Sequence, residues 1–130
     1  MIPPNCRISL VEQSHKSIII SRDLSGSCGT YHSPLVIEAK PGQTINISNM
    51  DFAHRDGGSA SSCSMKYGQV TDTSNRRRES MCHSSNRNNQ LMLSNGNRVE
   101  IALHKNEISG FVLLQFEGKY LPVKINLNKI

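Results

Sequence analysis

The sequence contains few aromatic residues and no apolar run long enough to cross a membrane. Its 130 residues include three Phe, three Tyr and no Trp. Because sheet-based nucleic-acid modules stack bases on exposed aromatic side chains, this composition argues against nucleic-acid binding. A membrane-spanning helix needs about 20 consecutive apolar residues. No segment approaches that length, so we expect no membrane span in this chain.

Motifs that carry catalysis or bind metal ions are also missing. There is no Cys-x-x-Cys or His-x-x-x-His pair to hold zinc. Neither a nucleophile elbow nor a phosphate-binding loop appears. The histidines do not fall into ligand spacing, which is typical of separate loop residues; they are His15, His32, His54, His83 and His104. We therefore predict no enzymatic activity and no cofactor.

Four cysteines are present, at positions 6, 28, 63 and 82. An even number without close pairs favours two disulfides over a metal site. Only 36% of the residues are hydrophobic, so the core is modest and covalent cross-links add useful stability. Disulfides persist in oxidising compartments, which predicts an extracellular protein. The spacing by itself does not choose among the possible pairings.

Short β-strand patterns separated by turn-forming residues extend along most of the chain. In Thr44–Ser48, Val99–Leu103 and Val123–Leu127 every second residue is apolar, as in a sheet with one buried face. Further strand patterns cover Arg7–Val11, Ser17–Ile20, Leu35–Ala39 and Phe111–Phe116. We find no sustained helical periodicity. About eight to ten strands predict an all-β fold, an antiparallel β-sandwich that forms a single domain over residues 1–130.

The order of these elements resembles that of a CUB domain. Cys63–Asp72 is similar to the family's cysteine, aspartate-tyrosine pair and following strand, and Leu91–Ile101 is similar to its strand, turn and next strand. Gly110–Phe116 resembles the Gly-Phe opening of a late core strand. Ile37–Ile45 resembles an earlier strand, glycine turn and strand.

The resemblance implies a CUB-like jelly-roll sandwich, an extracellular recognition role without catalysis, and the sequential disulfides Cys6–Cys28 and Cys63–Cys82. The core of the domain is expected over about residues 6–117, with 118–130 as a C-terminal extension or an extra edge strand. The first residues lack the apolar stretch of a secretory signal. We therefore expect one domain of a larger secreted or membrane-anchored protein, such as a receptor ectodomain.

Many CUB domains bind calcium through acidic residues at one end of the sandwich. In this chain Asp56 falls near the place of the first of these acids, but Lys66 and Lys105 fall at the other two. Calcium requires oxygen ligands, and an ammonium group repels it. The family's calcium site is therefore predicted to be lost. Either the two lysines are ordinary solvated residues, or they form a basic end that accepts an acidic partner.

The densest basic run is Arg76, Arg77 and Arg78, in a chain whose net charge is +5. Guanidinium groups pair bidentately with sulfate, phosphate and carboxylate. This run, with Lys66 and Lys105, is therefore the candidate partner-binding set, and a solvated hairpin tip is the alternative.

Asn46-Ile47-Ser48 is an acceptor pattern for N-glycosylation, as expected in an extracellular glycoprotein. Its position on an alternating strand predicts that Asn46 points away from the core.

Together these features predict a non-catalytic extracellular module that binds another protein. One alternative is a charge-led domain that binds acidic glycosaminoglycans or an anionic surface and loses affinity steeply as salt rises. A second alternative is a structural spacer or self-association domain. The sequence leaves the identity of the partner and the oligomeric state open.

Overall fold

The computed structural model describes residues 5–23, 26–52, 66–82 and 88–120. In chain order these residues form β1 (Arg7–Ser9), β2 (His15–Ser21), β3 (Leu35–Glu38), β4 (Gln43–Asp51), β5 (Lys66–Asp72), β6 (Arg78–Cys82), β7 (Asn88–Leu93), β8 (Arg98–Leu103), the 3-10 helix η1 (Lys105–Glu107) and β9 (Phe111–Tyr120). No helix in these ranges is long and apolar enough to cross a membrane.

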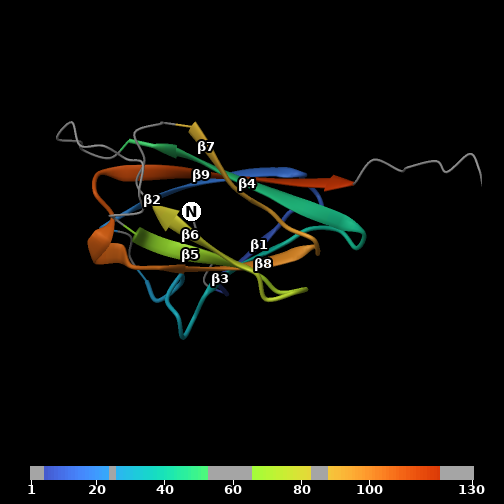
Figure 1. Cartoon of the computed structure of the whole chain (residues 1–130), viewed down its shortest axis with the longest axis horizontal. Coiled ribbons are helices and arrows are strands. Elements are labelled where there is room, and N and C mark those ends of the chain that lie inside the picture. The colour runs from blue at the N-terminus through green and yellow to red at the C-terminus, as the bar shows by residue number, and fades with distance from the viewer. Residues whose placement is uncertain (1–4, 24–25, 53–65, 83–87, 121–130) are drawn as a thin grey trace, which may run out of the picture.

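The strands form two stacked sheets (Figure 1). The five-stranded sheet has the order β1-β3-β8-β5-β6, and the four-stranded sheet has the order β2-β9-β4-β7. Some consecutive strands lie in different sheets, such as β1 and β2 or β7 and β8, so the chain crosses repeatedly between the layers. The expectation of an all-β fold arranged as a sandwich is confirmed.

One strand pair departs from the antiparallel arrangement that the sequence predicted. β1 pairs with β3 in parallel, with Ile8 opposite Ile37, whereas the other described pairs are antiparallel. The reason is the strand between them, because β2 lies in the other sheet. The chain therefore returns to the five-stranded sheet by a crossover, which joins parallel strands, and not by a hairpin.

The last described strand is longer than the sequence pattern indicated. β9 continues to Tyr120, past the boundary expected at residue 117, and Gly118 pairs with Ile45 on β4. The strand expected at Val123–Leu127 lies outside the described residues.

Alternating burial along the strands builds the core between the two sheets. On β4, Ile45 and Ile47 are fully buried, whereas Asn46 between them is partly exposed, as the side-chain period of two predicts. Tyr67 and Phe116 are the largest fully buried side chains. Each buried side chain of this size contributes about 1.5–3 kcal/mol, and together they hold the two layers in contact.

A disulfide joins Cys6 to Cys28, with 5.2 Å between the two Cα atoms. This is the first of the two pairings that the resemblance implied, and it connects the start of β1 to the loop of residues 26–34. Cys82 is disulfide-bonded as well, but its expected partner, Cys63, lies outside the described residues. One disulfide is thus described with both partners, and the second pairing stays a prediction.

The carboxylate of Asp72 is buried at the end of β5 and joins two turns. It accepts hydrogen bonds from Ser74 Oγ at 2.7 Å and from the Ser74 N–H at 3.1 Å, both in the β5–β6 turn. It also accepts one from the N–H of Asn95 in the β7–β8 turn at 2.6 Å. The two turns approach so closely that a Cβ on Gly96 would lie 2.8 Å from Ser74 Cβ.

The same contacts determine the acidity of Asp72. Burial by itself raises the pKa of this carboxyl, but the hydrogen bonds from Asn95, Ser74 and Gly96 outweigh it and leave the pKa below its ordinary value. The charged form of Asp72 is therefore the form that stabilises the fold.

Replacing Cys6 and Cys28 together with alanine is expected to lower the free energy of unfolding by about 3 kcal/mol. The reason is that the cross-link spans 22 positions and restricts the unfolded chain. Urea unfolding of the two proteins measures the difference. Alkylation with and without prior reduction counts the paired cysteines, and four free thiols in a folded sample would contradict both the cross-link and the extracellular expectation.

Replacing Asp72 with asparagine is expected to destabilise the fold at neutral pH by about 1–3 kcal/mol, because several donors lose a charged acceptor. Since the pKa of Asp72 is lowered in the folded state, its contribution is complete above about pH 4 and disappears as the pH falls through the folded pKa. The stability gap between wild type and D72N should therefore shrink on acidification. Urea titrations across pH measure it, with Asp23→Asn on an exposed carboxylate as the control. If the stability difference between wild type and D72N does not change with pH, the pKa of Asp72 is not lowered in the folded state.

Candidate functional site

The five basic residues singled out from the sequence lie at opposite ends of the five-stranded sheet. Lys66 begins β5, and the register of β5 with β8 brings it to the end where Lys105 follows β8 in η1. At the other end of β5, Arg76 and Arg77 lie in the turn that follows it, and Arg78 begins β6 opposite Thr71. A strand of this length spans about 20 Å. The structure therefore does not bring the lysines and the arginines into one site.

At the lysine end, the two side chains differ in their contacts. Lys105 Nζ donates a hydrogen bond to the carbonyl of Gly26 at 2.6 Å. Lys66 is half-buried and lies opposite Cys82 on β6. Because a backbone carbonyl already engages one ammonium group, this end is a weaker anion site than two unengaged lysines would form.

At the arginine end, the three side chains have different environments. The Arg77 guanidinium donates to the carbonyl of Leu93 at 2.6 Å, so it joins the turn to the end of β7. Arg76 has a left-handed backbone, with φ of 60°, and its N–H donates to the carbonyl of Asp72 at 2.8 Å. No hydrogen bond or ion pair joins the guanidinium of Arg76 or of Arg78 to another described residue. Both groups are therefore available to a ligand.

Arg76 and Arg78 line a concave site on the outer face of the five-stranded sheet, which we call the outer-face trough. It encloses about 430 Å³, a volume within the range of small-ligand sites. β5 and β8 form its floor, with Gln69 opposite Ala102 and Thr71 opposite Glu100. Its lining consists of Tyr31, Pro34, Gln69, Thr71, Thr73, Arg76, Arg78, Glu100 and Ala102.

Tyr31 forms the end of the trough opposite the arginines. Its ring is 56% exposed and packs edge-on against His104, with 5.5 Å between ring centroids. The hydroxyl of Tyr31 also shares a hydrogen bond with His104 Nε2 at 3.1 Å. The loop that carries Tyr31 is closed by a bond from the N–H of Gly29 to the carbonyl of Ser33 and is cross-linked through Cys28. These contacts fix the position of the ring.

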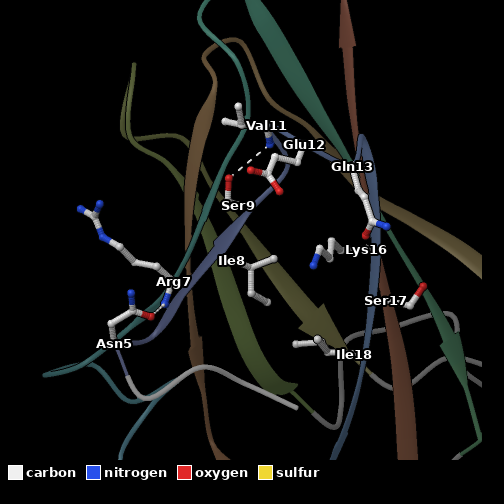
Figure 2. A pocket seen from close by; sticks show the side chains of 10 residues that line it. All are labelled: Asn5, Arg7, Ile8, Ser9, Val11, Glu12, Gln13, Lys16, Ser17 and Ile18. Atoms are coloured by element: carbon white, nitrogen blue, oxygen red, sulfur yellow. Dashed lines mark hydrogen bonds between the residues drawn. The ribbon is translucent and has the colours of Figure 1, made fainter.

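A larger groove of about 790 Å³ opens between the edge strands β1 and β2 (Figure 2). The nearly buried side chains of Ile8 and Ile18 form its apolar floor. Its charged residues are of mixed sign, namely Arg7, Glu12 and Lys16. Arg7 points away from the groove in Figure 2. The charges of this groove therefore do not converge on one ligand.

The outer face of the four-stranded sheet carries an apolar row that is exposed at Ile19 and half-buried at Leu113 and Met50. Ile19 on β2 is 61% exposed and lies opposite Leu113 on β9, which lies opposite Met50 on β4. Next to this row, the exposed ring of Phe111 stacks on Phe52 with 4.8 Å between centroids. Exposed apolar groups of this kind mark contact surfaces, but this row offers no charge that would select a partner.

No group of three or more acidic, histidine or cysteine side chains in the described ranges is arranged to hold a metal ion. Asp56, the expected first acid of a family-type calcium site, lies outside those ranges. A buried polar contact connects the sheets instead, where Asn49 Nδ2 donates to the hydroxyl of Tyr67 at 2.7 Å. Burial and the nearby charge of Asp51 raise the pKa of Tyr67 in spite of this bond, so the Tyr67 hydroxyl stays neutral within the core.

Asn46 faces outward on β4, as its strand position predicted, but it is only partly exposed. Its Oδ1 accepts a hydrogen bond from Gln90 Nε2 on β7 at 2.6 Å. That bond does not use Nδ2, the atom to which an N-linked glycan attaches. Glycosylation of Asn46 stays a prediction.

Sequence reasoning identified Arg76 and Arg78 but missed the rest of the outer-face trough. Tyr31, Thr71 and Glu100 are common surface residue types in three separate segments. Alternation along β5 and β8 was a signal that Thr71 and Glu100 face outward. No local pattern indicates that these side chains share a cavity.

Comparisons with known proteins add no family assignment. No protein-family model matches the chain, and no curated protein matches it. The resemblance to CUB domains therefore depends on the order of elements and cysteines within this sequence.

Addition of calcium is expected to leave the midpoint of thermal unfolding unchanged, because the resemblance to CUB domains predicts Lys66 and Lys105 at the places of two calcium-binding acids. An ion that binds the folded protein must raise the midpoint as its concentration increases. Thermal unfolding in EDTA and at increasing calcium concentration measures this. A saturable rise that disappears in Asp56→Asn would contradict the predicted loss of the site.

Proposed function

We propose that this chain is a CUB-like, non-catalytic extracellular module that binds an acidic region of another protein through the outer-face trough. On this proposal it is one domain of a larger secreted or membrane-anchored protein. The observation that carries the proposal is that one concave site holds two guanidinium groups, those of Arg76 and Arg78, for which the described residues offer no partner.

The extracellular part of the proposal is supported by the covalent cross-link. A disulfide between Cys6 and Cys28 is expected to persist only where thiols are not kept reduced. A core without tryptophan also gains more from such a cross-link than a larger core would.

The binding part of the proposal is supported by charge and by rigidity. A net charge of +5 raises the rate at which acidic partners approach the molecule. The turn that carries Arg76 is held through Asp72 and through the bond from Arg77 to Leu93. Because this backbone is already ordered, binding does not have to order it, and less affinity is lost to entropy.

The lining of the trough suits binding better than catalysis. Its one carboxylate, that of Glu100, lies 3.6 Å from a guanidinium nitrogen of Arg98. General acid–base chemistry needs a group positioned to transfer a proton to the substrate. The carboxylate of Glu100 lies opposite Thr71 but is paired with Arg98, and the Thr73 hydroxyl donates to the backbone carbonyl of Arg98 at 3.1 Å.

Two alternatives remain, each with one supporting feature. Charge-led binding of a glycosaminoglycan would use the same two arginines, and its affinity would fall steeply with salt. Self-association would use the partly exposed apolar row around Ile19, and light scattering at increasing protein concentration separates it from the other two.

The proposal predicts that Arg76→Gln/Arg78→Gln loses at least about ten-fold in affinity for an extracellular protein partner, the equivalent of one charge-assisted hydrogen bond. The matched control is Arg7→Gln/Arg22→Gln, which removes the same charge from exposed positions outside the trough. Wild type and both variants are screened against an array of purified extracellular domains, with thermal unfolding as a check on the fold. If a partner binds Arg76→Gln/Arg78→Gln with the same affinity as the control variant, the trough is not its binding site.

A further inference from the structure

The outer-face trough has three zones of different chemistry along its length. Arg76 and Arg78 form a cationic end, Gln69, Thr71 and Glu100 form a polar centre, and Tyr31 forms an aromatic end. From Gln69 to Thr73 the floor follows β5 and its turn for about 13 Å. A ligand that contacts both ends is therefore longer than a single ring or a single amino-acid side chain.

The cationic end offers two guanidinium groups to an anionic ligand. The guanidiniums of Arg76 and Arg78 have no partner among the described residues. Each can form two parallel bonds to a carboxylate or to a sulfate.

The centre of the trough disfavours a second negative charge. Thr71 lies between Arg78 on β6 and Glu100 on β8 in the strand register. The side chain of Glu100 is 36% exposed, and Arg98 lies at 3.6 Å from it. Glu100 can accept hydrogen bonds, and the part of its charge that Arg98 does not offset repels a second anion, so the part of the ligand that lies here carries donors such as hydroxyl groups. A polyanion with charges along its whole length does not match this pattern.

The aromatic end offers a flat apolar surface. The ring of Tyr31 is exposed, and its contacts with His104 hold it at the rim. An aromatic face of this kind packs against the apolar C–H face of a neutral sugar ring, while hydroxyl groups around the ring reach polar neighbours.

The position of the trough within the sheet argues against an added peptide strand. β5 and β8 are interior strands with a neighbour on each side, so their backbone groups bond within the sheet. A peptide that adds as a strand needs an unpaired sheet edge. Recognition here depends on side chains alone, and Gln69, Thr71 and Thr73 provide short polar groups suited to hydroxyls.

From this arrangement we propose that the outer-face trough binds a short acidic oligosaccharide with one carboxylate or sulfate group. The anionic group pairs with Arg76 and Arg78, a neutral sugar ring packs on Tyr31, and hydroxyls between them bond to the polar centre. The inference rests on the proposed function, because it identifies the partner's acidic region as a glycan that the partner carries.

The test measures binding by isothermal titration calorimetry with defined probes. The probes are sialyllactose with one carboxylate, lactose sulfate with one sulfate, neutral lactose, and a heparin oligosaccharide. The variants are Arg76→Gln/Arg78→Gln, Tyr31→Ala and the control Arg7→Gln/Arg22→Gln. The two acidic lactose derivatives separate a carboxylate ligand from a sulfate ligand.

Wild type is expected to bind at least one singly charged probe at least about ten-fold more tightly than lactose. The trough arginine variant should abolish that preference, and the control variant should retain it. Tyr31→Ala should weaken lactose and the acidic probe by a similar factor, because it removes the contact with the neutral ring.

Three results would overturn the inference. The first is that neither singly charged probe shows saturable binding. The second is that the trough and control variants lose the same affinity for these probes. The third is that the heparin oligosaccharide binds most tightly and that its affinity falls steeply with salt. If the singly charged probes fail while a protein on the array still binds in a way that depends on Arg76 and Arg78, the glycan inference is wrong and the proposed function stands. If no array partner depends on these arginines, the proposed function fails separately.

Discussion

The buried carboxylate of Asp72 holds the end of the sandwich where the chain passes from the four-stranded to the five-stranded sheet. Its hydrogen bonds from Ser74 and Asn95 join a turn within one sheet to the turn that connects the two sheets. A charge is stable in this position because every hydrogen bond it accepts favours the ionised form. The arginine end of the outer-face trough depends on this contact, since the same turn carries Arg76.

The other end of the trough depends on a different constraint. The disulfide between Cys6 and Cys28 connects the loop of Tyr31 to β1, and His104 contacts the ring itself. One end is thus ordered by hydrogen bonds to a charge and the other by a covalent link. A site whose two ends are ordered before binding loses less entropy when a ligand arrives. This preorganisation matters in a shallow site, where each contact with the ligand is weak on its own.

Much of the fold could be predicted because strand patterns are local. Alternation on β4 correctly placed Ile45 and Ile47 inside and Asn46 outside. The parallel pairing of β1 with β3 could not be predicted in this way, because a short strand pattern does not encode which strand lies beside it. The basic residues show the same limit. Arg78 and Lys66 were grouped by charge, but they lie near opposite ends of β5.

By itself the sequence determined the class of the fold, the inward and outward faces of its strands, and the basic character of the surface. These three properties depend only on the order of the residues along the chain and on the polarity and charge of their side chains. Only the tertiary structure decided that Tyr31, Glu100 and Arg78 line one cavity. The physical reason is that they belong to a loop and to two strands separated by β5, and they meet only when those strands pair in one register.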